Sequence, residues 1–383
     1  MMKRVLIVNN NLCMGGVQKA LINLLWNIRT DVDVTLLLFY KGGELLKELP
    51  PEVKVITPDS GYVYLGMPGS HAKTIRQKLC RSFYAAIARL FGRKYAVGLM
   101  DLGQKKLSGY DVAVSYLHNG GDKVFYGGCN EFVLKHVQAD KKITFLHCDY
   151  TLCGADTAQN AALNEKFDRI AACSQGCADA FLSVNPHLKE KVQIVPNCHR
   201  FKHIREEAAQ AEVELPQGRL NLVTVARLGK EKGVERAVQA LAKLGKNLEK
   251  LHYYIIGDGI LRPQLEELIE KEQLQDYVTL CGQLQNPYGY IQAADLLVIP
   301  SYSEAAPLVI GEAACLGTPV LSTKTSSAEE MLTQTGFGVV CENSVEGLVE
   351  ALSEIVAGTT VLQTSHPVSN DRALAQFYKC LKE

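Results

Sequence analysis

The stretch LNLVTVARLGKEKG, from Leu220 to Gly233, decides the fold that we expect for this chain. Its apolar run Leu220–Ala226 has the pattern of a buried strand, and a helical pattern follows near Val234–Leu244. This strand opens a series of alternating strands and helices, and a separate series of the same kind precedes it. Because such alternation produces parallel sheets, we predict an α/β protein with two Rossmann-like domains.

The expected strands are near-continuously apolar, which is typical of parallel strands covered on both faces. In the first series they are Arg4–Val8, Asp33–Phe39, Val53–Ile56, Asp111–Ser115, Ile143–His147, Ile170–Ser174 and Val192–Val195. In the second they are Leu220–Ala226, Tyr253–Ile256, Val278–Cys281, Leu296–Ile299, Val320–Ser322 and Val339–Cys341. We expect the two domains to face each other across a cleft that binds a ligand at the carboxyl ends of their strands.

A polar and acidic stretch without a strand pattern separates the two series, and we predict that it connects the domains, in part as a helix. The predicted parts are an N-terminal domain (residues 1–200), a linker (201–218), a C-terminal domain (219–365) and a final, largely helical segment (366–383). A chain of 383 residues is long enough for two domains that each bury a core.

The composition is that of a soluble globular protein, with 47% hydrophobic and 21% charged residues. The 41 basic and 41 acidic residues cancel, which argues against a general nucleic-acid-binding surface. The charge is unevenly divided, because residues 1–200 hold 25 Lys and Arg against 17 Asp and Glu. The stretch Lys73–Lys106, with nine basic residues and one acidic residue, accounts for this whole surplus.

The 12 cysteines form no C-x-x-C pair, so we expect free thiols in a reducing compartment. The nearest pairs, Cys148 with Cys153 and Cys173 with Cys177, lack a second pair at zinc-site spacing, and no metal site is expected. The apolar run after Arg4 is too short for a signal peptide, and no run approaches the about 18 residues of a membrane span. We therefore expect a cytoplasmic protein.

Paired glycines, Gly15 and Gly16, follow the first expected strand and precede a helix. Glycines let the backbone approach a ligand closely, and the N–H groups at a helix start favour an anion. The pattern is not G-x-G-x-x-G, which disfavours a nicotinamide site. A tight turn between strand and helix explains the pair equally well.

Arg227 and Lys232 follow the strand Leu220–Ala226, so both cations can point into the expected cleft. A planar arginine fork together with a lysine point charge suits a diphosphate. The alternative is a solvated basic turn.

Glu304 and Glu312 bracket seven residues, with a helix expected to start near Ala306. Two carboxylates beside a helix N-terminus could hold sugar and ribose hydroxyls while the amides hold phosphate. A surface helix with incidental acids is the alternative, but Glu312 lies in an apolar run, where a carboxylate needs a partner.

His147 lies at the end of the expected strand Ile143–His147. A histidine at a strand terminus in a cleft can donate to a substrate hydroxyl or stabilise charge. Taken alone, this histidine favours a structural role.

In combination these residues resemble the retaining glycosyltransferases of the GT-B superfamily, the group that includes bacterial capsular and lipopolysaccharide sugar transferases. The resemblance covers most of the chain, and its most specific part is the pair of glutamates. The motifs that carry it are Gly15-Gly16, His147, Val195-Pro196-Asn197, Val225-Ala226-Arg227-Leu228, Lys232-Gly233, Gly257-Asp258-Gly259, Glu304, Glu312 and Gly317-Thr318-Pro319-Val320.

The resemblance implies a role for each residue in the second domain. Arg227 and Lys232 would neutralise the donor diphosphate in place of a metal ion. Glu304 would hold hydroxyls of the donor sugar, and Glu312 would hold the ribose. The remaining substrate contacts would come from Gly257 and from the backbone of Ala306, Pro307, Leu308 and Val309.

In the first domain, the resemblance implies that His147 touches the transferred sugar and that the Gly15-Gly16 loop lies near the phosphate and the acceptor. The final helix would cross back to this domain. The sequence departs from the family at Ala305-Ala306, where many relatives have glycine and an aromatic residue, and at Gln18, where an acidic residue is frequent.

The activity implied by the resemblance is transfer of a hexose-type sugar from a nucleotide diphosphate, with a UDP-sugar favoured, and with retention of anomeric configuration. The acceptor would be a hydroxyl of a glycan or lipid-linked acceptor in capsule or lipopolysaccharide synthesis, and no cofactor or metal is expected. In a front-face mechanism the leaving phosphate would accept the acceptor proton. The alternatives are a nucleotide-sugar epimerase, a phosphorylase and a non-catalytic glycan-binding or scaffold protein.

Residues 73–94 have the pattern of one cationic amphipathic helix, with Ile75, Leu79, Phe83, Ala86, Ile87 and Leu90 on its apolar face. Such a helix can lie on an anionic membrane. Packing on the first sheet, with a solvated basic face, is equally open. We therefore predict a peripheral membrane enzyme whose stretch 73–106 contacts an anionic membrane surface or an anionic acceptor.

Overall fold

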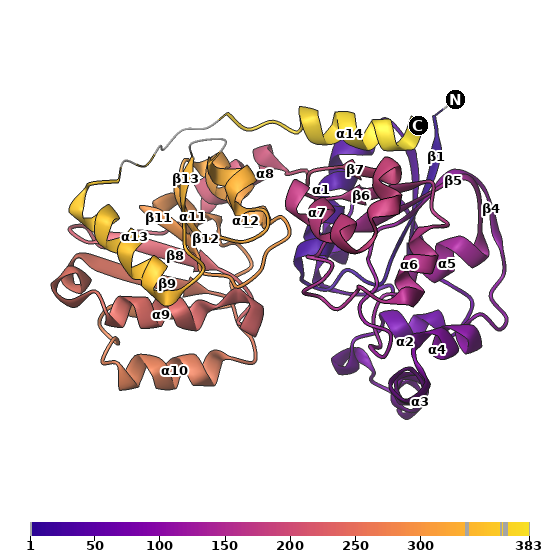
Figure 1. Ribbon diagram of the computed structural model, residues 1–383, viewed down its shortest axis with the longest axis horizontal. Coiled ribbons are helices and arrows are strands. Elements are labelled where there is room, and N and C mark those ends of the chain that lie inside the picture. The colour runs from indigo at the N-terminus through magenta and orange to yellow at the C-terminus, as the bar shows by residue number, and fades with distance from the viewer. Residues whose placement is uncertain (1, 334–336, 361, 363–366, 383) are drawn as a thin grey trace. The chain divides into compact units, whose positions relative to one another are not determined.

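The computed structural model describes residues 2–333, 337–360, 362 and 367–382. The chain divides into two compact units: the first unit comprises residues 1–198 and 370–383, and the second comprises residues 199–369. Each unit is described by itself below, with its elements labelled in Figure 1. Within the described ranges, no helix is long and apolar enough to cross a membrane.

A seven-stranded parallel sheet forms the centre of the first unit, in the order β3-β2-β1-β4-β5-β6-β7. The strands are β1 Arg4–Asn9, β2 Asp33–Leu38, β3 Lys54–Ile56, β4 Leu107–Ser115, β5 Val137–Leu146, β6 Arg169–Ala172 and β7 Val192–Ile194. The expected strands are confirmed, although β4 and β5 begin earlier than predicted. The strand order reverses between β1 and β4, which is the switch point where Rossmann-like sheets bind ligands.

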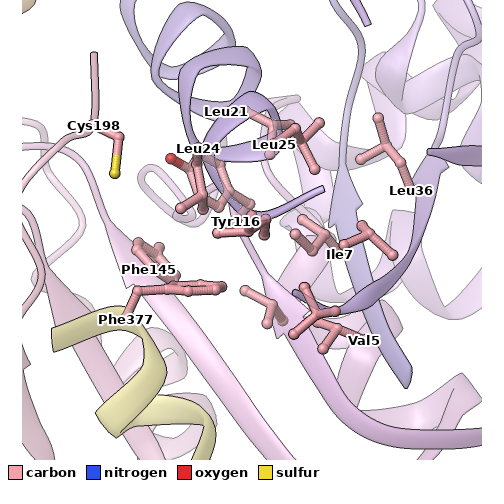
Figure 2. Packing of buried hydrophobic residues seen from close by; sticks show 14 of the residues in the cluster. Val5, Ile7, Leu21, Leu24, Leu25, Leu36, Tyr116, Phe145, Cys198 and Phe377 are labelled. Atoms are coloured by element: carbon pink, nitrogen blue, oxygen red, sulfur yellow. The ribbon is translucent and has the colours of Figure 1, made fainter. Parts of the chain in front are cut away.

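Alternate side chains of β1 fill two separate cores because successive residues of a strand point to opposite faces. Val5 and Ile7 pack with α1, and Leu6 and Val8 pack in the second cluster. Figure 2 shows the first of these clusters, in which Phe377 of the C-terminal helix lies beside Phe145 of β5. The helices of this unit are α1 Gly16–Ile28, α2 Tyr62–Gly66, α3 Ile75–Phe91, α4 Arg93–Met100, α5 Cys129–His136, α6 Ala158–Asn164, α7 Gln175–Val184 and α14 Asp371–Lys382.

The second unit repeats this plan around a six-stranded parallel sheet, in the order β10-β9-β8-β11-β12-β13. Its strands are β8 Leu220–Val225, β9 Leu251–Ile256, β10 Val278–Gly282, β11 Leu296–Ile299, β12 Val320–Thr323 and β13 Gly338–Cys341. Its helices are α8 Phe201–Gln210, α9 Val234–Ala242, α10 Arg262–Lys271, α11 Tyr288–Ala293, α12 Leu308–Leu316 and α13 Val345–Ala357. The stretch that opened the sequence analysis thus becomes β8, a turn and the start of α9.

The stretch expected as a linker, residues 201–218, belongs to the second unit instead. Its first part is α8, whose Ile204 and Ala208 are buried in a cluster with Ile310 and Ala313 of α12. The helix expected for part of this stretch is therefore confirmed as α8. The end of the predicted C-terminal domain, residues 363–365, and residue 366 of the predicted final segment lie outside the described residues.

The basic stretch forms two helices, where the sequence predicted one. Gly92, at φ +101°, adopts a conformation that other residues rarely accept, so α3 ends at Phe91 and α4 begins at Arg93. Arg93 is fully buried and contributes no charge to the surface. Conversely, Ile75, Leu79, Phe83 and Leu90 of α3 point away from the core, with 57–78% of each residue exposed.

Candidate active site

Two predicted site residues of the second unit form a direct ion pair. Lys232, just before α9, donates from Nζ to Oε1 of Glu304 at 2.7 Å. Ser301, two residues beyond β11, donates its hydroxyl to the same carboxylate oxygen at 2.7 Å. The Glu304 side chain is only 11% exposed, whereas that of Lys232 is 26% exposed, so the cation is the more accessible partner. Both recorded bonds end on Oε1, which leaves Oε2 of Glu304 to accept hydrogen bonds from a ligand.

Polar contacts from Arg236 and Asn343 hold the loop that carries Glu304, and those of Arg236 to the Pro300 carbonyl are buried. Arg236 of α9 is 4% exposed, and its guanidinium donates to the carbonyl oxygen of Pro300 and to Oδ1 of Asn343 at 2.6 Å. Asn343 in turn donates to the carbonyl of Tyr302 at 3.1 Å. Sequence reasoning missed these supporting residues, although an arginine among the apolar positions of the helix Val234–Leu244 was a visible signal.

Arg227 is placed differently from Lys232. Its side chain is 74% exposed, and one guanidinium nitrogen lies 2.5 Å from Oε1 of Glu231. Burial would raise the pKa of Glu231, but its own backbone N–H and the Arg227 guanidinium together hold that pKa below its ordinary value. Arg227 is therefore an accessible cation, paired with an acid that the sequence analysis did not single out.

A cavity of about 580 Å³ lies on the other side of Glu231. It is lined mainly by apolar surface from residues at the starts of α9 and α10, together with Tyr302. None of the predicted site residues, all of which the structure describes, lines it. The cavity therefore adds no support to the predicted roles.

Gly257 is a position that only glycine can occupy. Its φ is +141°, and a Cβ there would lie 1.8 Å from the carbonyl oxygen of Ala226. The segment after β9 runs directly along the segment after β8, and the N–H of Leu228 donates to the carbonyl of Asp258 at 3.0 Å. This contact places Gly257 next to the backbone that carries Arg227.

Helix α12 begins at Leu308, two residues later than the start near Ala306 that the sequence analysis expected. Pro307 occupies the N-cap position with an extended backbone, at ψ 120°, so the first helical amides are those of Leu308 and Val309. His199 Nε2 lies 3.0 Å from the carbonyl oxygen of Leu308. Glu312 is 2% exposed within the helix, so it is not an incidental surface acid.

In the first unit, the paired glycines lie at the start of α1. Gly15 is the N-cap with φ −178°, an extended conformation open to any residue, and a Cβ on Gly16 would meet nothing within 4 Å. The tight-turn explanation therefore does not account for them. The N–H of Met14 donates to Oε2 of Glu44 at 2.9 Å, which places a carboxylate beside this loop.

His147 follows β5 directly, and its ring packs against aromatic side chains. Ring centroids lie 4.6 Å from Tyr116 and 5.6 Å from Phe145. Burial of the ring, with a smaller effect of His118, lowers the pKa of His147 to about 3, so the imidazole is neutral near pH 7. Its Nε2 is buried and, among the described residues, has no hydrogen-bond partner. A substrate hydroxyl could supply that partner.

Residues 205–365 match the family described as glycosyl transferases group 1. An alpha-D-kanosaminyltransferase of Streptomyces kanamyceticus is 31% identical over 146 residues, which is 37% of this chain and 38% of that protein. The lipopolysaccharide core biosynthesis glycosyltransferase LpsD of Rhizobium meliloti is 27% identical over 169 residues, which is 44% of this chain and 48% of that protein. These matches span only about a third to a half of the curated relatives.

Two solved structures are similar over nearly the whole chain. Anabaena HepE in complex with UDP has a TM-score of 0.63 at 17% identity, covering 94% of this chain and 91% of that one. WaaG, a glycosyltransferase involved in lipopolysaccharide biosynthesis, has a TM-score of 0.56 at 18% identity, covering 98% and 94%. At these identities the likeness concerns the fold, and it confirms the predicted GT-B architecture of two Rossmann-like domains.

Proposed function

We propose that the chain, whose residues 205–365 match the family of group 1 glycosyl transferases, transfers a hexose-type sugar from a nucleotide-diphosphate donor to an acceptor hydroxyl. A UDP-sugar is the favoured donor, since the similar HepE structure was solved with UDP and with UDP-glucose. The acceptor is a glycan or a lipid-linked glycan of a cell-surface polysaccharide, in line with the relative named for lipopolysaccharide core biosynthesis.

The observation that carries this proposal is the Lys232–Glu304 ion pair, 2.7 Å long, beside the exposed Arg227. A lysine ammonium has three donors, and Glu304 uses one of them, so Lys232 keeps two for phosphate oxygens. Arg227 adds a planar fork that matches a second phosphate. Glu304 Oε2 then accepts a hydroxyl of the sugar that the diphosphate carries.

In the proposed reaction, the bond between the anomeric carbon and the donor phosphate breaks while the acceptor oxygen attaches to the same face of the sugar. The departing phosphate oxygen takes the acceptor proton, so no protein base is needed and the configuration is retained. Arg227 and Lys232 stabilise the charge that develops on the diphosphate and take the place of a metal ion. His147, being neutral, contributes a hydrogen bond and not a charge.

Helix α3 supports peripheral attachment to an anionic membrane. Its apolar residues Ile75, Leu79 and Leu90 are 66–78% exposed, and Lys78 and Arg89 are exposed on the same helix. These three side chains do not pack on the sheet, whereas Ile87 of the same predicted face packs against the core of the first unit, and the exposure of the three supports a membrane contact. A lipid-linked acceptor would be reached from the same surface.

Donor binding tests the proposal. A panel of UDP-, GDP- and ADP-sugars should include one that raises the melting temperature, because a ligand at 100 times its Kd stabilises by about 2.7 kcal/mol. Lys232→Ala should lose this shift, whereas Lys246→Ala, at an exposed lysine of the same unit, should keep it. Absence of any donor-specific shift, or an equal shift in Lys232→Ala, would contradict the proposed site.

A further inference from the structure

Three side chains that bind soft metals converge in the first unit, outside the residues assigned above. They are His118, three residues after β4, Cys148, two residues after β5, and Cys153 in the following turn. One ligand atom from each lies within 4.8 Å of the other two. Zn²⁺ prefers this set of imidazole nitrogen and thiolate sulfur.

The local fold brings the two cysteines together. Asp149 accepts hydrogen bonds at Oδ1 from the Thr151 hydroxyl and the Leu152 N–H, and the N–H of Cys153 donates to the Asp149 carbonyl at 3.0 Å. This turn returns Cys153 to Cys148, with the two Sγ atoms 2.9 Å apart. The thiol of the neighbouring Cys177 is directed elsewhere, to the carbonyl of Cys148.

His118 is the independent observation that points to a ligand. The residue is 8% exposed, and its Nδ1 is buried without a hydrogen-bond partner in the described part of the chain. A buried polar atom left unpaired costs about 1–3 kcal/mol, so such atoms usually have a partner. A metal ion held by His118 and the two cysteines would give the imidazole a partner at this cluster.

A buried network braces the segments that carry these ligands. The guanidinium of Arg93 donates to the carbonyl of Gly120 at 2.8 Å and to Oδ1 of Asn160 at 2.6 Å. Asn160 also donates to the carbonyl of Ala155 at 2.9 Å. The chain after His118 and the chain after Cys153 are therefore fixed to each other, as a preformed site requires.

We propose that His118, Cys148 and Cys153 form a Zn²⁺ site with three protein ligands and one position open to water. Cys153 is exposed, so water can reach the ion. Both thiols lose their protons to solvent when the ion binds. Two Zn–S bonds of about 2.3 Å at a tetrahedral angle separate the sulfurs by about 3.8 Å, a small outward rotation from their present spacing.

A disulfide between the two cysteines is the competing outcome, with sulfurs about 2.0 Å apart. It would leave the His118 nitrogen without a partner, whereas the metal site uses all three groups. Metal binding is measured separately from transferase activity, and the residues proposed to bind the diphosphate belong to the second unit whereas the zinc ligands belong to the first.

Metal titration of the full chain tests the site. After reduction and removal of metal, the protein should bind one Zn²⁺ in competition with a chromophoric chelator. Co²⁺ should give the thiolate-to-cobalt charge-transfer band of a tetrahedral sulfur site. Cys148→Ser, Cys153→Ser and His118→Gln should each weaken binding by more than about tenfold, since even loss of a supporting contact costs 10–100-fold.

Cys80→Ser is the matched control, because Cys80 is a free, partly buried cysteine of the same unit outside the cluster. It should bind Zn²⁺ as the unmodified chain does. Weak, non-stoichiometric binding by the unmodified chain would overturn the proposal. So would undiminished affinity in the His118→Gln variant, or recovery of the Cys148–Cys153 disulfide in place of the metal complex.

Discussion

Arg93 shows how much a single residue can depend on its surroundings. In the sequence it is one of nine basic residues in the stretch Lys73–Lys106. In the structure its guanidinium is buried, lies 3.1 Å from Oε1 of Glu131, and donates to the Gly120 carbonyl and to Asn160. A charge without water needs this full set of partners. The residue therefore braces the first unit and does not contribute to a cationic surface.

Removing the Arg93 guanidinium should be costly. Arg93→Met leaves the Glu131 carboxylate buried without its cation, and breaking a buried pair in this way costs about 3–5 kcal/mol. Urea unfolding measures the free energy of unfolding of Arg93→Met against that of the unmodified chain. Lys94→Met is the control, since Lys94 is exposed and should change stability by less than about 0.5 kcal/mol. Equal stabilities would show that the network contributes nothing.

Gly257 allows a second prediction at the same scale. Gly257→Ala places a methyl group 1.8 Å from the Ala226 carbonyl oxygen at a φ of +141°. Backbone strain of this kind costs on the order of 1–3 kcal/mol before the clash is counted. Gly98→Ala, in α4 with nothing within 4 Å, should instead stabilise by about 0.5–1 kcal/mol. Thermal melts in which the two substitutions shift the melting temperature in the same direction would refute the argument.

At the scale of the element, the periodicity of the sequence was a good guide to strands and a poorer guide to where helices begin and end. The apolar run Leu220–Ala226 predicted β8 well, because a parallel strand that is buried on both faces is recognised by a continuous run of apolar residues. Helix α12 starts at Leu308 because the backbone of Pro307 is extended, with ψ 120°, and because a proline disfavours the helical conformation at the residue before it, Ala306. Helix α3 ends at Phe91 because Gly92 has a positive φ.

Helix α3 carries the prediction that belongs to this scale. The Lys78→Glu/Arg89→Glu double variant should float with anionic vesicles at least about tenfold less than the unmodified chain, since each basic residue contributes about 1 kcal/mol near a charged surface. Arg81 is left unchanged because its Nε donates to the Met67 carbonyl at 2.8 Å. Reversing the charges of Lys78 and Arg89 therefore tests attraction to the anionic membrane while the hydrogen bond of Arg81 stays intact.

The matched control for α3 is Lys246→Glu/Lys250→Glu, which reverses two exposed lysines of the second unit. It should float like the unmodified chain, and neutral vesicles should bind all three proteins weakly. Equal flotation of the two double variants would assign the exposed face of α3 to another partner. Leu79→Ser/Leu90→Ser separately tests the apolar contribution.

At the scale of the whole molecule, the two parallel sheets were predictable, because both series of strands are legible in the sequence and the family motifs occur in order. Contacts between side chains that lie far apart in the chain could not be predicted from the sequence. The approach of His118 to Cys148 and Cys153 was one such contact, since His118 follows another strand, 30 residues before Cys148. In the same way, the sequence did not indicate that the segment 201–218, expected as a partly helical connection, packs within the second unit.

The measurement that tests the central claim most directly is nucleotide release from a panel of donor sugars, without added divalent metal ions. We predict that at least one UDP-sugar is turned over, and that Lys232→Ala or Glu304→Ala lowers the rate by about 10²–10³-fold while the fold stays intact. Release from none of the donors would contradict the transferase account. Full activity in both variants would contradict the site that we assign to the diphosphate.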